Sequence, residues 1–403
     1  MARAALSRSG RQIVDTAPHM TAVRADAIQY LELSALKEEI GAYVQDTGER
    51  WAQRIERERR VPLELWDELR GRGYLRLAAP AEYHGRGLPL TQYLELLEIF
   101  SMSHGSLRMI VHVCNGIWRP IASHANDEQR ERFLLPLVAG EIKVAFTLTE
   151  PTAGTGADLR CSVVREGDTY HLSGEKHLIT FGSIADYLLV IARVQGTRGG
   201  DGTLALMVPP RGDGVQATEM PESMGVRGTD HAHLRFDRAP VPVANRLGEE
   251  GDGLNVALGG FLAPSRISLA MTCVGLAQRA LELAVGYAKR RETFGRKLAE
   301  RQAISFKLAE MSTDIEAARS LVMHAARAWE SDGEAIAESA MAKLFAGAML
   351  QRVTDAALQV HGGIGYFAPS PIERVYRDAR AQLFEEGTAE IQKMTIARSL
   401  LRQ

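Results

Sequence analysis

Apolar residues recur at helical spacing through the first third of the chain. Residues 26–60 carry one apolar stripe among many charges, which predicts a long helix. Pro62 stands in the first turn of a second predicted helix, a position that proline favours, and the glycines at 71–73 end that helix. Further helices are predicted over 91–100 and 129–137. We therefore expect an all-helical N-terminal third.

The pattern changes at about residue 144. Short runs rich in Val, Leu, Ile and Thr now alternate with Gly and Asp turns, which is typical of β-strands. The expected strands lie at 162–164, 170–172, 186–194, 203–208 and 231–236. They predict a compact antiparallel β domain that closes at 240–242.

Helical spacing returns after the glycine-rich turn at 248–253 and continues to the end of the chain. The long segments have the lengths and apolar stripes of a helix bundle; they are 266–289, 302–329, 335–360 and a final helix from 391. The expected fold class is mainly α with a β domain. Its predicted parts are a disordered leader at 1–24, an N-terminal helical domain at 25–143, a middle β domain at 144–254 and a C-terminal helical bundle at 255–403.

Composition narrows the function classes. The chain has 403 residues, more than one hydrophobic core usually serves, so two or three domains are expected. The 48 Lys and Arg against 50 Asp and Glu give no basic excess, which argues against nucleic-acid or membrane partners. No apolar run approaches the roughly 18 residues of a membrane span. Cys114, Cys161 and Cys273 are widely spaced, which predicts buried thiols in a reducing, cytoplasmic setting.

One carboxylate near the C-terminus lies in an unusual context. Glu386 precedes Gly387 and Thr388, directly before the apolar-periodic run that begins at Ile391. Thr388 could serve only as the N-cap of the last helix, with Ile391 starting its buried face. Alternatively, the acid at the mouth of that helix faces a pocket. The local pattern leaves both interpretations open.

Several other stretches invite a functional interpretation. Residues 146–158 form a turn rich in small and hydroxyl-bearing residues, which allows a backbone to approach a planar or anionic ligand, although such turns often only reverse the chain. The glycines at 362–365 do not follow a strand, so they are no Rossmann fingerprint. His231 and His233 share a strand face, but no third ligand lies nearby; solvent-facing alternation explains them, and no metal site is predicted.

Together these stretches resemble the signatures of the acyl-CoA dehydrogenase family. Residues 377–392 are similar to R-D-A-K followed by I-x-E-G-T-x-E-I-Q. Residues 147–158 are similar to T-E-P-G-A-G-S-D, and 174–180 to G-x-K-x-W-I-T-N. Residues 287–311 are similar to Y-x-x-x-R-x-x-F-G and Q-x-x-x-x-x-L-A-x-M, and 359–366 to Q-x-x-G-G-x-G-Y. The matches run in family order from about residue 62 to residue 398.

The resemblance implies an N-terminal helical domain, a middle antiparallel β domain and a C-terminal four-helix bundle, assembled as a homotetramer that binds FAD. It implies α,β-dehydrogenation of an acyl thioester to the trans-2-enoyl thioester. Glu386 would remove the α-proton, and the β-hydrogen would leave as hydride to flavin N5. The implied carrier is CoA or an acyl carrier protein, and the implied electron acceptor is electron-transfer flavoprotein or another acceptor.

By position, the resemblance also assigns site residues. Glu386 is the catalytic base, and no metal is implied. The cofactor contacts are Phe146, Leu148, Thr149, Gly154, Thr155, Leu178, Thr180, Arg291, Phe294, Gln302, Gln359, Gly362, Gly363, Thr388 and Glu390. The substrate contacts are Thr155, Arg266 and Gly387. Within the first set, Arg291, Gln302 and Gln359 would reach the FAD of a neighbouring subunit.

The chain departs from the family pattern where that pattern binds the thioester carrier. Thr152 and Gly156 replace a glycine and an aspartate, and Leu178 replaces an aromatic that covers the flavin. Some relatives carry the base in D-x-E-R on another helix; here 263–266 reads Ala-Pro-Ser-Arg, so that base and a usual carrier contact are missing. The changes at Thr152, Gly156 and Ala263 predict weak activity on straight-chain fatty acyl-CoA and better activity on a specialised acyl group or carrier protein.

Two other functions stay compatible with the sequence. One is flavin-dependent oxygenation or nitroalkane-type oxidation on the same fold, against which the retained Glu386 argues. The other is a catalytically silent FAD-binding or assembly protein. Glu385 is unusual beside such a base; adjacent residues point apart in a helix, so we expect Glu385 to face solvent or an arginine rather than to share the proton.

Overall fold

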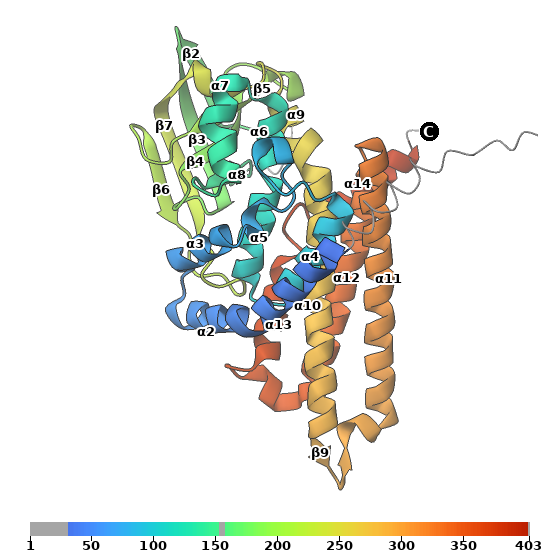
Figure 1. Cartoon of the computed structure of the whole chain (residues 1–403). Coiled ribbons are helices and arrows are strands. Elements are labelled where there is room, and N and C mark those ends of the chain that lie inside the picture. The colour runs from blue at the N-terminus through green and yellow to red at the C-terminus, as the bar shows by residue number, and fades with distance from the viewer. Residues whose placement is uncertain (1–30, 153–157, 402–403) are drawn as a thin grey trace, which may run out of the picture.

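The computed structural model describes residues 31–152 and 158–401, so the predicted leader and the site candidates Gly154 and Thr155 lie outside the described residues. A β domain lies beside a layer of short N-terminal helices, and a bundle of long C-terminal helices extends away from both (Figure 1). The three predicted parts are confirmed in this order along the chain.

The N-terminal third is helical, as predicted. Residues 31–43 form a helix that passes through a π-helical turn, η1 (Val44–Gly48), into α2 (Glu49–Glu58). Pro62 lies at the N-cap of the next helix, one residue earlier than expected. The remaining helices are α3 (Leu63–Gly71), α4 (Leu90–Ser101), α5 (Gly105–Gly116), α6 (Trp118–His124), α7 (Asp127–Gln129), η4 (Arg130–Leu134) and α8 (Leu135–Val138).

The β domain is one twisted sheet with the strand order β6-β7-β3-β2-β4-β5-β8, and β1 pairs with β4 at its side. Its strands are β1 (Val144–Thr147), β2 (Ser162–Glu166), β3 (Thr169–Thr180), β4 (Tyr187–Val194), β5 (Thr203–Val208), β6 (Val215–Glu219), β7 (His231–Pro242) and β8 (Arg246–Leu247). Most pairs are antiparallel, but β1–β4 and β2–β4 run parallel. The sequence did not indicate β6, because this edge strand is almost wholly exposed and its five residues include only two apolar side chains, Val215 and Ala217.

Strand β4 shows why its sequence is a continuous apolar run. Leu188 and Val190 point into the core inside the β domain, whereas Leu189 and Ile191 pack against the N-terminal helices. A strand buried on both faces needs apolar residues at every position. The β domain is thereby fixed against the helical layer that also borders the functional site.

The C-terminal part is built on three long helices, α10 (Ala263–Arg290), α11 (Gln302–Asp332) and α12 (Ile336–His361). Gly275 lets α10 lie close to α4, because a Cβ there would stand 2.3 Å from the Glu98 carbonyl oxygen. The other elements are α9 (Gly253–Ala257), η7 (Leu258–Leu262), the hairpin β9 (Glu292–Thr293) and β10 (Arg296–Lys297), α13 (Pro371–Ala381) and α14 (Ala389–Leu401). By length and composition α10 could span a membrane, but it is the mostly buried core helix of this bundle.

Candidate active site

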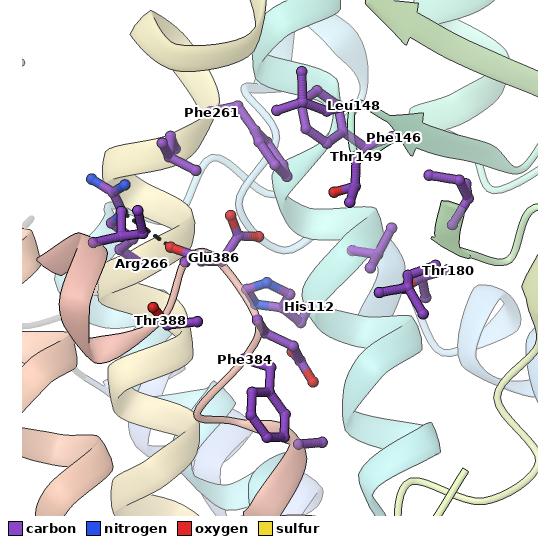
Figure 2. Close-up of a pocket in the computed structure, with 18 of the residues that line it drawn as sticks. His112, Phe146, Leu148, Thr149, Thr180, Phe261, Arg266, Phe384, Glu386 and Thr388 are labelled. Atoms are coloured by element: carbon purple, nitrogen blue, oxygen red, sulfur yellow. Dashed lines mark hydrogen bonds between the residues drawn. The ribbon is translucent and has the colours of Figure 1, made fainter. Parts of the chain in front are cut away.

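A cavity of about 1300 Å³ opens where the three parts meet. Its walls come from α5, from β1 and the end of β3, from the start of α10, and from the loop between α13 and α14. Figure 2 shows Glu386 and Arg266 on one side, Thr149 and Thr180 on the other, and His112 between them. This volume exceeds the roughly 300–1000 Å³ of an ordinary small-molecule site, so it can hold two ligands together.

The loop that carries Glu386 has an uncommon backbone. Glu386 has φ 54° and Gly387 has φ 94°, and a left-handed conformation is costly for a residue with a side chain. Side chains from three helices hold the loop by its carbonyl groups. Gln392 donates to the carbonyl oxygens of Glu386 and Gly387, each over 3.0 Å. Arg266 Nε donates to Glu386 O over 3.3 Å, and Lys343 Nζ donates to Gly387 O.

Glu386 lines the cavity. Among the described residues, no acceptor is bonded to the Glu386 amide N–H. The carboxylate accepts a hydrogen bond from Ser265 Oγ at 2.8 Å. Burial raises the pKa of Glu386, while the Ser265 hydrogen bond opposes that rise. A carboxylate with a raised pKa is a stronger base, so Glu386 is suited to proton abstraction.

Glu385 points to an arginine, as expected. Its Oε2 lies 3.5 Å from Arg108 Nη1. Arg108 is itself 1% exposed, and its Nη2 donates to Gln382 Oε1 over 3.0 Å. The charge of Glu385 adds to the rise in the Glu386 pKa, but no hydrogen bond joins the two carboxylates within the described residues. The structure therefore presents one base and one charge-paired neighbour.

A buried ion pair fixes the opposite wall. Lys176 Nζ lies 3.0 Å from Glu150 Oε1 and donates to Leu148 O over 2.8 Å, while Glu150 accepts the amides of Arg160 and Cys161. These bonds set the backbone that presents Phe146, Leu148 and Thr149 to the cavity. The register of β3 against β7 shifts between Lys176 and Ile179, and the intervening Leu178 takes φ 58° and stays 55% exposed.

The wall residues fit a flavin. The hydroxyl groups of Thr149 and Thr180 line the cavity and have no hydrogen-bond partner among the described residues, so they are available to a polar ring edge. Leu178 lines the same space with an exposed apolar side chain that could cover an aromatic ring face. These three residues are therefore the ones that would hold the ring.

Not all of the predicted site residues meet at this cavity. Phe146, Leu148, Thr149, Leu178, Thr180, Arg266, Glu386, Gly387 and Thr388 line it. Glu390 does not; it is exposed, and a hydrogen bond from Thr388 lowers its pKa. The remaining candidates lie on the bundle surface away from the cavity: Arg291, Phe294, Gln302, Gln359, Gly362 and Gly363. Within one chain these two sets are separate.

Several site residues escaped the sequence analysis. On α5, His112 lines the cavity, and on α10, Ser265 contacts the Glu386 carboxylate. The loop that carries Glu386 is bonded by Lys343 from α12 and by Gln392 from α14. Helical periodicity places such residues on an inward face but does not say which loop they meet. His231 lines the cavity instead of facing solvent. Among the described residues no cluster of His, Cys, Asp and Glu could hold a metal ion.

Comparisons with known proteins agree with this geometry. The chain matches the acyl-CoA dehydrogenase N-terminal domain at residues 31–141, the middle domain at 145–239 and the C-terminal domain at 251–401. It is 36% identical over 352 residues to an acyl-CoA dehydrogenase of Bacillus subtilis, covering 87% of this chain and 93% of that protein.

Two further relatives are informative. The CarC subunit of the caffeyl-CoA reductase-Etf complex of Acetobacterium woodii is 33% identical over 351 residues, with 87% of this chain and 92% of that protein covered. The structure of butyryl-CoA dehydrogenase from Megasphaera elsdenii superimposes with a TM-score of 0.86 at 32% identity, covering 92% of this chain and 98% of that chain. The chain belongs to the acyl-CoA dehydrogenase family, flavoprotein oxidoreductases that act on CH–CH donors.

Proposed function

We propose that this protein catalyses the α,β-dehydrogenation of an acyl thioester with FAD as its cofactor and Glu386 as the base. One observation carries the proposal: Glu386, with a raised pKa, lines the cavity opposite Thr149 and Thr180, whose hydroxyls bond to none of the described residues. A bound flavin supplies the hydride acceptor. The base and the ring-binding residues thus lie on opposite sides of a space that can hold the acyl chain.

The protein side of the reaction follows from the loop geometry. An α-proton beside a thioester is weakly acidic, so both the base and the developing enolate need help. Glu386 takes the proton at its carboxylate, which Ser265 orients through its hydrogen bond to Oε1. The unpaired Glu386 amide N–H can donate to the thioester oxygen, where negative charge develops.

The partners of the reaction are also proposals. The thioester carrier is CoA or an acyl carrier protein, with a specialised acyl group preferred. A relative from an Etf complex supports electron-transfer flavoprotein as the electron acceptor. That relative is named a reductase. The same residues can serve dehydrogenation of the acyl thioester and reduction of the enoyl thioester, because the base that removes the α-proton also returns it. The acceptor then decides the direction.

A homotetramer in the cytoplasm is the proposed working form. Large apolar side chains of the C-terminal part stay exposed in a single chain, including Phe294, Tyr366, Phe367 and Leu401, and burial between subunits would remove them from water. The cavity also lacks Arg291, Gln302 and Gln359, which the family resemblance places against a neighbouring subunit's FAD. Cys114, Cys161 and Cys273 are free thiols, which supports a reducing compartment.

The proposal is tested by mixing the purified holoprotein with acyl thioesters under anaerobic conditions. Rapid bleaching of the oxidised flavin absorbance, with formation of the 2-enoyl thioester, is the expected result. Flavin bleaching without any thioester would support the oxygenase alternative. A product that forms only when oxygen is present would support it as well. Absence of bleaching across CoA and carrier-protein thioesters would support a silent FAD-binding protein.

A further inference from the structure

The segment between β6 and β7 places a strained residue at the cavity. Residues 223–230, called here the Val226 turn, lead into β7, and three of them line the cavity: Ser223, Gly225 and Val226. Val226 takes φ 53°, and a left-handed conformation is a genuine outlier for a β-branched residue. Such strain persists only where the surrounding structure holds it, so the contacts of this turn show how it is held.

Two buried side chains bond the backbone of Val226 from opposite sides. Asp378 on α13 accepts the Val226 amide at Oδ1 over 2.6 Å and the Gly105 amide at Oδ2 over 3.0 Å. Ser106 Oγ on α5 donates toward the carbonyl oxygens of Val226 and Arg227, over 3.2 and 2.7 Å. Asp378 is only 1% exposed, and Ser106 is fully buried. The strained residue is therefore bonded at both its N–H and its C=O.

The Asp378 carboxylate also joins the three parts of the chain at one point. Asp378 belongs to the C-terminal part, Gly105 begins α5 in the N-terminal part, and Val226 belongs to the β domain. The backbones approach closely here, because a Cβ on Gly225 would stand 2.2 Å from the Arg377 carbonyl oxygen. Removing a buried acceptor that bonds two amides would leave both amides unsatisfied. The carboxylate thus fixes the Val226 turn against α13.

Both ends of this connection reach the candidate active site. Helix α13 ends at Ala381, and the loop that carries Glu386 follows it. On the other side, the carbonyl oxygen of Asp230, the last residue of the turn, accepts the Phe181 amide over 2.8 Å. Phe181 directly follows Thr180, which lines the cavity opposite Glu386 (Figure 2). A change in the turn would therefore displace the Thr180 wall relative to the base.

We infer that Asp378 and Ser106 are positioning residues for the flavin, because they hold Val226 in its left-handed conformation. The Val226 turn then fixes the Thr180 wall, where the ring would bind. This inference rests on the proposed FAD cofactor and adds the residues that keep its binding wall in place. Asp378 and Ser106 act through the backbone that they bond. Without their bonds the valine would relax toward negative φ, the wall would shift, and the flavin would be held less tightly.

The test measures how fast FAD leaves the diluted holoprotein, from the flavin absorbance that passes an ultrafiltration membrane. Ser106→Ala and Asp378→Ala should each speed FAD release about tenfold or more, since each removes bonds that hold the strained residue. Ser101→Ala is the matched control; this buried serine of α4 bonds to Leu97 O and does not contact the turn. Ser106→Ala is the milder change and keeps the test decisive if Asp378→Ala does not fold.

Substitutions of Val226 itself separate this role from general packing. Glycine adopts a left-handed conformation without steric cost, whereas alanine retains most of that cost. Added to Val226→Gly, Ser106→Ala should therefore change FAD release by less than about threefold. Added to Val226→Ala, it should still speed FAD release about tenfold. Both Val226 variants lose side-chain contacts, so the comparison isolates the backbone conformation.

Two results would overturn the inference while leaving the cofactor intact. One is an equal effect of Ser106→Ala in the Val226→Gly and Val226→Ala proteins, because the bonds would then act through packing alone. The other is unchanged FAD release in both Ser106→Ala and Asp378→Ala. A wild-type protein that is purified without FAD and takes up none is a different outcome. It would contradict the proposed cofactor itself, and the inference with it.

Discussion

The Ser265 hydroxyl on α10 donates a hydrogen bond of 2.8 Å to Oε1 of Glu386, which lies 121 residues later in the chain. Ser265 stands where the D-x-E-R pattern of some relatives has a glutamate. A hydroxyl at this position cannot replace the base, but it can orient the base and stabilise its charge. Removing this hydrogen bond should therefore change the pKa of Glu386.

Replacing Ser265 with Ala should shift the pH dependence of flavin reduction. The Ser265 bond favours the charged carboxylate, so its loss should raise the pKa of Glu386 further. Only the deprotonated carboxylate can remove the proton, so the rate of flavin reduction rises with pH through this pKa. In Ser265→Ala the acid limb of the pH–rate profile should therefore move to higher pH. Ser268→Ala, a buried serine on the same helix that does not contact Glu386, is the control. If the acid limbs of Ser265→Ala and Ser268→Ala lay at the same pH, Ser265 would have no role in setting the pKa of Glu386.

Gln392→Leu should slow flavin reduction and lower stability together. The buried Gln392 amide supports both carbonyl groups of the strained loop, and each unsatisfied buried group costs about 1–3 kcal/mol. Thermal unfolding and single-turnover flavin reduction measure the two effects. Lys393→Ala, at the exposed neighbouring position, should change neither. Full activity in Gln392→Leu would show that the loop holds its shape without this side chain.

Arg291→Ala tests the assembly of the cofactor site. Arg291 is exposed and distant from the cavity in one chain, yet the family resemblance places it at the FAD of a neighbouring subunit. We expect the variant to lose FAD and to dissociate in parallel, measured by flavin absorbance and by light scattering after size exclusion. Arg296→Ala, in the adjoining hairpin, is a matched exposed control. Full flavin occupancy in an intact oligomer would count against the shared site.

Glu56 should make stability sensitive to acid. Its carboxylate accepts from Arg377 Nη2 over 3.0 Å and lies 3.3 Å from His104 Nε2 and 3.5 Å from Arg227 Nη1. These contacts join α2 to α13 and to the β domain. Burial alone would raise its pKa, but the hydrogen bond with His104 and the charge of Arg377 lower that pKa to about 2.

The sign of the effect follows from this shift. A carboxyl with a depressed folded pKa stabilises the protein above its unfolded pKa of about 4.5, and the contribution is lost as pH falls toward 2. It amounts to at most about 3 kcal/mol. Glu56→Gln should remove this part of the pH dependence of unfolding, whereas Asp46→Asn, at the exposed ion pair with Arg50, should not. Identical acid limbs for wild type and Glu56→Gln would contradict the assignment.

Much of the architecture could be predicted from local pattern. The amphipathic stripes of α10, α11 and α12 and the apolar run of β4 each follow from burial on one or both faces. Strand β6 escaped prediction because an exposed edge requires no alternation, and the parallel pairs of β4 depend on which strands meet in space. Neither fact is encoded in a short window of sequence.

The site divides in the same way. The sequence could assign three residues to the site, because each lies in a contiguous motif: Glu386, Thr149 and Thr180. Ser265 and His112 could not be assigned, because Ser265 acts through a carboxylate 121 residues later in the chain, and His112 lies beside the Ser265 hydroxyl from a different helix. Gln392 lay inside the quoted motif, yet its role required the loop geometry to become visible. Arg291 and Gln359 were named from resemblance, and a single chain does not bring them to the cavity.

The central claim is that Glu386, and not Glu385, removes the α-proton. The decisive measurement is anaerobic stopped-flow flavin reduction by a thioester that wild type uses, applied to Glu386→Gln and Glu385→Gln. We expect Glu386→Gln to bind FAD and thioester yet reduce the flavin at least about 10²- to 10⁴-fold more slowly. Glu385→Gln should retain most of the rate, because its side chain is paired with Arg108. Flavin that still bleaches rapidly in Glu386→Gln while Glu385→Gln is inactive would contradict the account.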